Sequence, residues 1–242
     1  MISIIYLILA GALLPFCGSQ LQLLWKNQLG DIYSLGLGSA ACLGASLAAC
    51  FGFSMFTGSY MCCILLTAVI TLIYNKLTIE KLLTVGMILG SFVGAVGTIV
   101  ANNCSPEALH QYYRWAGASF NIQLSNYQVA LSLIYIVLGL ILLWVRSEDS
   151  RAVFIGVSLI VLSIISVCGV IGMISLTAPN VARIMYKGNN SAIKLWLPSV
   201  IGLSLLSITY LITEYCNFGI YLPISATMSI VSLPLLISVI KK

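Results

Sequence analysis

The sequence predicts an all-α polytopic membrane protein with about nine transmembrane helices. Its composition, its apolar runs and the placement of its charges lead to this prediction. Of the 242 residues, 60% are hydrophobic and only 7% are charged, and the mean hydropathy is +1.09. A water-soluble domain carries roughly 25% charged residues. There is too little charge here to cover a globule, so most of the surface must contact lipid.

Apolar runs of a length suited to crossing a bilayer follow one another along the chain. A helix needs roughly 20 apolar residues to cross about 30 Å of hydrocarbon. The sixth and seventh runs abut at Gly169–Gly172, and no Gly/Ser-rich linker or long charged run divides the chain. We therefore expect one transmembrane domain over residues 1–242. The nine runs are 2–24, 34–53, 56–74, 82–101, 127–145, 152–170, 171–186, 195–213 and 221–240.

The basic residues are placed almost entirely at alternate connections between these runs. If each run crosses once, ten of the eleven Lys and Arg residues lie on one side of the membrane, and Arg114 alone lies on the other. By the positive-inside rule the basic side is cytoplasmic. This places the N-terminus outside and the C-terminus in the cytoplasm. The ten residues are Lys26, Lys76, Lys81, Arg146, Arg151, Arg183, Lys187, Lys194, Lys241 and Lys242.

The eight cysteines indicate no metal site. Six of them fall inside the apolar runs, where cysteine behaves as a small hydrophobic residue. The adjacent pair Cys62 and Cys63 points to different faces of a helix, and no spacing matches a zinc site. We expect neither a metal nor a cofactor. Cys104 and Cys216 fall in connections expected outside, where a disulfide between them is an open question.

Several of the runs carry small residues at a four-residue spacing. Gly86, Gly90 and Gly94 form one such stripe, and Gly36 with Gly44 belongs to another. Small side chains allow the backbones of two membrane helices to approach closely. The favoured interpretation of both stripes is therefore helix packing.

Motifs near the start of the chain resemble those of the FecCD-type permeases. Gly11, Gly18 and Gln22 lie in the first run, the loop reads Asn27-Gln28-Leu29-Gly30-Asp31, and Leu35-Gly36 opens the second run. That family comprises the iron-siderophore, haem and vitamin B12 importers, and it has an Asn-Pro-Leu-Ala loop at this place.

Two later stretches extend this resemblance over nearly the whole chain. The segment GVIGMISLTAPNVAR, residues 169–183, is similar to the most recognisable stretch of the family, with Asn180 where a histidine is usual. The motif positions after the first loop are Gly172, Pro179, Arg183, Gly188, Pro223 and Pro234.

The resemblance implies the fold of the vitamin B12 importer permease, without its first helix. It implies a transport subunit in the bacterial cytoplasmic (inner) membrane that works by alternating access. Two permeases, as a homodimer or heterodimer, would receive an iron chelate or cobalamin from a substrate-binding protein outside, and ABC ATPase subunits would act on them inside. The chain has no phosphate-binding loop or catalytic set of its own and no sign of nucleic-acid binding. We expect a transporter and not an enzyme.

One departure from the family concerns the contact with the ATPase. The family carries a cytoplasmic segment that resembles a coupling helix after its sixth helix, whereas this chain has only residues 146–151 there. Six residues cannot form two helical turns and also connect two helix ends. The acidic pair Glu148 and Asp149 is either a remnant of that segment or part of a solvated turn, and the turn is favoured. The candidate ATPase-facing residues are Arg146, Glu148, Asp149, Arg151, Lys187 and Asn189.

On the opposite side, one connection holds the single histidine of the chain. We expect a loop over residues 102–114, in which Glu107, His110 and Arg114 are solvated or contact a docked binding protein. Glu214, at the outer end of the eighth run, is a further candidate for that contact.

Two other functions are compatible with a membrane protein of this composition. An autonomous channel or secondary carrier usually needs ionisable residues inside the membrane, and the runs contain almost none. A degenerate, non-transporting paralogue is the other alternative, and the short connection at residues 146–151 favours it.

Overall fold

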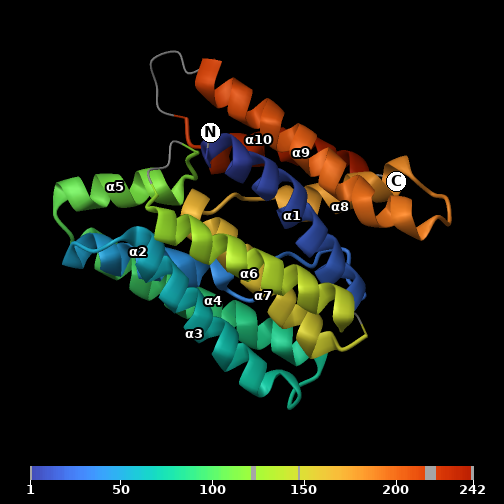
Figure 1. Cartoon of the computed structure of the whole chain (residues 1–242), viewed down its shortest axis with the longest axis horizontal. Helices are drawn as coiled ribbons and strands as arrows, with labels where there is room; N and C mark the ends of the chain where they lie inside the picture. Colours follow the sequence, from blue (N-terminus) through green and yellow to red (C-terminus); the bar gives the residue numbers. More distant parts are fainter. Residues whose placement is uncertain (1, 121–123, 147, 216–221, 241–242) are drawn as a thin grey trace. The chain divides into compact units, whose positions relative to one another are not determined.

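The protein is all-α in the computed structural model, which describes residues 2–120, 124–146, 148–215 and 222–240 (Figure 1). The described residues form ten helices and no strand. The helices are α1 (Ile2–Leu24), α2 (Leu37–Phe51), α3 (Met55–Tyr74), α4 (Ile79–Asn102), α5 (Pro106–Ala116), α6 (Asn126–Val145), α7 (Ser150–Cys168), α8 (Ile174–Met185), α9 (Ser191–Tyr215) and α10 (Ile224–Ile240).

Each of the nine apolar runs corresponds to one helix. The additional helix is α5, so the expectation of a loop at residues 102–114 was wrong. Ser105 caps this helix, because its Oγ accepts a hydrogen bond of 3.3 Å from the Ala108 amide. Pro106 follows at the first helical position, where its missing N–H costs nothing. Glu107 then places negative charge in the first turn. The sequence Ser-Pro-Glu is thus a helix start that hydropathy alone does not detect.

Six of the described helices, α1, α3, α4, α6, α7 and α9, are long and apolar enough to cross a membrane. Two shorter apolar helices are α2 and α10, and α8 has only 12 residues. The number of actual crossings therefore stays a prediction. The class of the fold, a helical protein with many apolar spans, is as the sequence predicted.

The chain divides into two compact units. The first comprises Met1–Asp31, Gly117–Ile122 and Ile171–Lys242 and holds α1, α8, α9 and α10. In this unit α1 packs against α8 and α9, and α10 packs against the same two helices. The second comprises Ile32–Ala116 and Gln123–Val170 and holds helices α2 to α7.

In the second unit, glycines set the closest helix contacts. A Cβ built on Gly44 of α2 would overlap the carbonyl oxygen of Gly58 in α3. Gly36 precedes α2 with φ +80, which favours glycine, and a Cβ there would lie 2.7 Å from the Cα of Gly90. A Cβ on Gly156 of α7 would lie 2.9 Å from the carbonyl oxygen of Gly139 in α6. These backbones are in direct contact, as packing inside a membrane requires.

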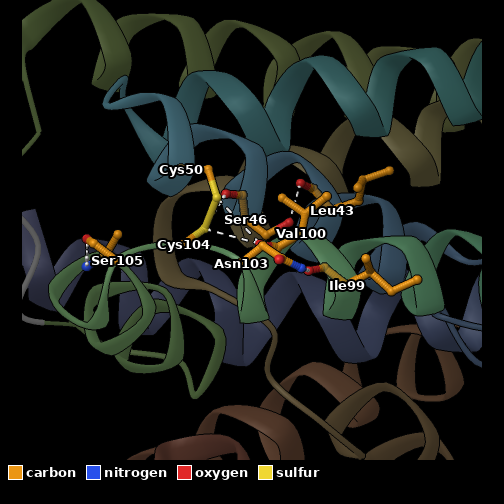
Figure 2. Close-up of a disulfide and its surroundings, with 9 residues drawn as sticks. Leu43, Ser46, Cys50, Ile99, Val100, Asn103, Cys104 and Ser105 are labelled. Atoms are coloured by element: carbon orange, nitrogen blue, oxygen red, sulfur yellow. Dashed lines mark hydrogen bonds between the residues drawn. A yellow bond between two sulfur atoms is a disulfide. The ribbon is translucent and has the colours of Figure 1, made fainter.

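A disulfide joins Cys50, near the end of α2, to Cys104, just after α4 (Figure 2). The two Cα atoms are 4.9 Å apart, and the bond closes a stretch with a sequence separation of 54. Cys104 therefore has a partner other than Cys216, which lies outside the described residues. The remaining described cysteines, Cys17, Cys42, Cys62, Cys63 and Cys168, are free thiols.

Candidate functional site

Some family-motif residues of the first unit converge on a polar network that joins α1, the loop after it and α8. Gln22 belongs to the last turn of α1, and Arg183 to the last turn of α8. The Nη2 of Arg183 donates a hydrogen bond of 2.7 Å to the Oε1 of Gln22 and one of 2.6 Å to the Oδ1 of Asn180. Two motifs that are far apart in the sequence thus meet at one guanidinium group.

Both amide side chains of this network are buried, and each is hydrogen-bonded at its nitrogen and at its oxygen. Gln22 is only 4% exposed and Asn180 only 5%. The Nε2 of Gln22 donates to the carbonyl oxygen of Gly30 at 3.0 Å. The Nδ2 of Asn180 donates to the carbonyl oxygens of Gln28, at 3.2 Å, and Leu176, at 2.7 Å. Because each buried amide has partners for its nitrogen and its oxygen, the network carries little desolvation cost.

The loop after α1 is held in a compact shape by its own residues. The Asn27 Oδ1 accepts a hydrogen bond of 2.9 Å from the Leu29 amide, which is an Asx turn. The Gly30 amide donates to the Asn27 carbonyl oxygen at 3.1 Å. Asp31 at the end of the loop accepts a hydrogen bond from the Ser175 hydroxyl in the first turn of α8. The end of the loop therefore lies against α8, with Gly30 buried, whereas Asn27, Gln28 and Leu29 are exposed, Leu29 at 73%.

Pro179 explains why α1 can approach α8 so closely. A proline in a helix has no N–H for the carbonyl four residues earlier, which here is that of Ser175. Gly18 of α1 lies against this carbonyl, since a Cβ on Gly18 would overlap the Ser175 oxygen. A Cα–H group in contact with a carbonyl oxygen gives a weak hydrogen bond. The freed carbonyl of α8 is thus covered by the glycine of the neighbouring helix.

The same arrangement recurs between α1 and α9. Pro15 within α1 leaves the carbonyl of Gly11 without its intrahelical donor. Gly202 of α9 covers that carbonyl, because a Cβ on Gly202 would lie 2.6 Å from the Gly11 oxygen. In return, a Cβ on Gly11 would lie 2.9 Å from the Cα of Leu203. The sequence motifs include Gly11, Asp31 and Ser175, but they assign no role to Asp31 or Ser175 and do not select Pro15 or Gly202. The roles of these four residues depend on contacts between distant segments.

The remaining motif residues of the first unit lie apart from the network. A Cβ on Gly172, which precedes α8, would lie 3.3 Å from the Oγ of Ser229 in α10. Gly188 lies against the ring of Tyr186 in the turn before α9. The Pro223 carbonyl accepts a hydrogen bond of 3.1 Å from the Thr227 amide at the start of α10, and Pro234 lies within that helix.

The candidate ATPase-facing residues lie at two separate turns. Between α6 and α7 the Oδ1 of Asp149 accepts a hydrogen bond of 3.0 Å from the Arg151 amide and caps α7. The Asp149 amide also donates to the Arg146 carbonyl at 3.0 Å. Asp149 thus has a local role as the N-cap of α7. Lys187 and Asn189 belong instead to the exposed turn between α8 and α9.

Three of the four candidate binding-protein-facing residues share one face of α5. Glu107, His110 and Arg114 are three and four positions apart, so they lie along one side of a helix. All three are exposed, whereas Tyr112, on the opposite side, is only 8% exposed and packs in a small cluster with Ala45 and Ala101. Glu214 is exposed near the end of α9, in the other unit.

The polar network supplies hydrogen bonds and no reacting group. It contains one cation, Arg183, and one carboxylate, Asp31, and it has no histidine. No group of three or more metal-ligating side chains is found within the described residues. What this arrangement can do is fix the α1 loop to α8 in one orientation.

Replacing Arg183 by methionine is expected to lower the free energy of unfolding by about 2–3 kcal/mol, because it leaves the Gln22 and Asn180 oxygens buried without a donor. Lys187→Met is the matched control. Both side chains are exposed, but the hydrogen bonds to Gln22 and Asn180 come from Arg183, so Lys187→Met should change stability by about 0.5 kcal/mol or less. Thermal unfolding in a neutral detergent measures both. An equal loss of stability in the two variants would show that the positive charge, and not the hydrogen-bond network, stabilises the fold.

Solved structures show the same fold. One is an inward-facing conformation of a metal-chelate type ABC transporter, with a TM-score of 0.86 at 21% identity over 99% of this chain and 85% of that chain. Another is PsaBC from Streptococcus pneumoniae in complex with Fab, with a TM-score of 0.64 at 14% identity over 98% of this chain and 89% of that chain. No curated protein matches the sequence.

The helices and these likenesses define a multi-pass membrane protein with the fold of an ABC transporter permease. The chain belongs to the FecCD transport family, whose profile matches residues 1–156 and 149–242. The two matched stretches overlap at the start of α7, directly after the short turn that Asp149 caps.

Proposed function

We propose that this chain is the transmembrane permease subunit of a binding-protein-dependent ABC importer for an iron chelate, such as a siderophore or haem, or for cobalamin. The observation that carries the proposal is the family match over both halves of the chain. The likeness to a transporter described as metal-chelate type supports the same substrate class. A pair of such permeases would enclose the pathway. In each permease the two compact units would together form one transmembrane domain.

The proposed topology has nine crossings, an external N-terminus and a cytoplasmic C-terminus in the bacterial inner membrane. In this topology the ends of α2 and α4 are outside, and these ends carry the disulfide between Cys50 and Cys104. Disulfides persist in oxidising compartments and are rare in the cytoplasm. The disulfide thus supports an orientation that was derived only from the basic residues. In the proposed orientation the exposed face of α5 would also lie outside, where a binding protein would dock.

Coupling to an ATPase is proposed to use a reduced surface. The described residues between Val145 and Ser150 form no helix, and the two matched stretches of the family profile meet and overlap next to this turn. The exposed α8–α9 turn, with Lys187 and Asn189, is the second candidate contact. A non-transporting paralogue would differ from a working permease in its coupling to the ATPase, because it would lack productive contact with that subunit.

Co-purification followed by reconstitution tests the proposal. The tagged chain, expressed from its native host and extracted in mild detergent, is expected to retain an ABC ATPase in about equal amount. The complex in proteoliposomes should accumulate a radiolabelled ferric siderophore, haem or cobalamin when ATP and the binding protein are supplied. Co-purification without ATP-dependent uptake of any of the three would indicate a non-transporting paralogue. Uptake without an ATPase would indicate an autonomous carrier and contradict the proposal.

A further inference from the structure

The first unit contains an open cavity of about 480 Å³ between α1, α8 and α9. It lies next to the polar network, because Arg183 belongs to both. Two further cations line it, Lys187 in the turn after α8 and Lys194 in the first turn of α9. No acidic residue lines the cavity.

These three cations are not neutralised by nearby carboxylates in the described part of the chain. The guanidinium of Arg183 bonds to the two neutral amides, Gln22 and Asn180. Lys187 and Lys194 are exposed and form no ion pair among the described residues. A concave surface that gathers three positive charges attracts an anion, and its field is strongest inside the hollow.

Apart from Ser19 and the Tyr186 hydroxyl, the rest of the cavity wall is apolar and reaches the protein surface. Leu23, Leu197 and Pro198 line it, and Leu23 is 69% exposed. This wall is formed by α1 and α9, two of the helices that are long enough to cross a membrane. A free phosphate ion would gain nothing from such a wall, whereas an acyl chain would bury it.

Aromatic residues mark the same end of the unit as a membrane interface. Tyr186 lines the cavity, and its hydroxyl accepts a hydrogen bond of 3.2 Å from the Asn190 amide. Trp196 on α9 is 62% exposed and stacks on Phe16 of α1, with ring centroids 6.3 Å apart. Tyr and Trp are enriched where hydrocarbon meets the headgroups. Basic pockets between helices on the cytoplasmic side are suited to anionic headgroups.

We propose that this cavity binds one anionic phospholipid, whose phosphodiester lies among Arg183, Lys187 and Lys194 and whose acyl chain lies along the wall of Leu23, Leu197 and Pro198. The lipid would join the ends of three helices and complete the surface beside the polar network. This inference does not depend on the proposed transport activity.

Native mass spectrometry of the detergent-purified full chain, titrated with phosphatidylglycerol or phosphatidylcholine, tests the proposal. The unaltered chain should retain phosphatidylglycerol preferentially. The double variant Lys187→Gln/Lys194→Gln should bind it roughly thirtyfold more weakly, from about fivefold for each cation near a charged lipid. The matched control is Lys76→Gln/Lys81→Gln, which removes two exposed lysines, one between α3 and α4 and one in the first turn of α4. Its affinity should change less than threefold.

Three results would overturn the proposal. Equal weakening by the two double variants would mean a diffuse surface effect. Displacement of phosphatidylglycerol by excess inorganic phosphate, together with phosphate binding in lipid-free detergent, would assign the cavity to a free ion. Unchanged lipid binding, with loss of a co-purifying ATPase from the Lys187→Gln/Lys194→Gln variant alone, would assign it to a protein partner. An unchanged melting temperature in neutral detergent ensures that the variants compared are folded.

Discussion

Replacing Gly18 by alanine is expected to destabilise the protein by roughly 3 kcal/mol or more, the upper end for an added methyl group in a packed interior. The new Cβ would overlap the carbonyl oxygen of Ser175, which belongs to the backbone and cannot rotate away. To admit it, α1 must separate from α8. That separation would also lengthen the hydrogen bond between Arg183 and Gln22, one turn further along α1.

Gly94→Ala is the matched control for Gly18→Ala. Gly94 also lies within a helix and in a stripe of small residues, but a Cβ there would lie 3.4 Å from the Ser39 Oγ, an ordinary contact. Both changes raise the intrinsic helix propensity by about 1 kcal/mol, so this contribution cancels. The melting temperature and the elution profile in detergent should be impaired for Gly18→Ala alone. If Gly18→Ala is as stable as the unaltered chain, the close contact between α1 and α8 is refuted.

Removing the disulfide by Cys50→Ser is expected to cost roughly 2–4 kcal/mol, because the bond closes a stretch with a sequence separation of 54 and so restricts the unfolded chain. The bond ties the end of α2 to the segment that leads from α4 into α5. Its loss should loosen α5 first, since this short helix packs on the chain through few buried side chains, among them Tyr112.

Cys62→Ser is the control for the cysteine change, because Cys62 is a half-buried free thiol in the same unit. A reductant should lower the melting temperature of the unaltered chain and of Cys62→Ser, and it should leave that of Cys50→Ser unchanged. Cys50 is exposed, so the reductant can reach the bond. Equal responses of all three proteins to the reductant would mean that the bond contributes nothing to stability.

The helices were predictable because the bilayer requires long apolar runs, and each run contains one helix. The helix α5 was not detected, because it is short and amphipathic and its signal is the cap at Ser105-Pro106-Glu107. Cys50 was counted as part of an apolar run, although it is the second-last residue of α2 and reaches the end of the helix. Hydropathy records composition, and both of these features depend on position at a helix end.

The polar network was only partly predictable. The resemblance to the family selected Gln22, Pro179 and Arg183, but it could not tell which side chains meet. That Gly18 covers the carbonyl freed by Pro179 follows from the arrangement of α1 against α8, which sequence spacing does not encode. The contact between Asp31 and Ser175 was not predictable for the same reason, because neither residue has an evident role until the loop folds onto α8.

Sided labelling of single cysteines tests the topology on which the transport proposal depends. Lys76, Glu107 and Lys187 would each be replaced by cysteine in a background that keeps only Cys50 and Cys104. A membrane-impermeant maleimide applied to intact cells should label the cysteine at position 107 and leave those at 76 and 187 unmodified until the membrane is opened. Labelling of positions 76 and 187 from opposite sides would contradict the proposed topology.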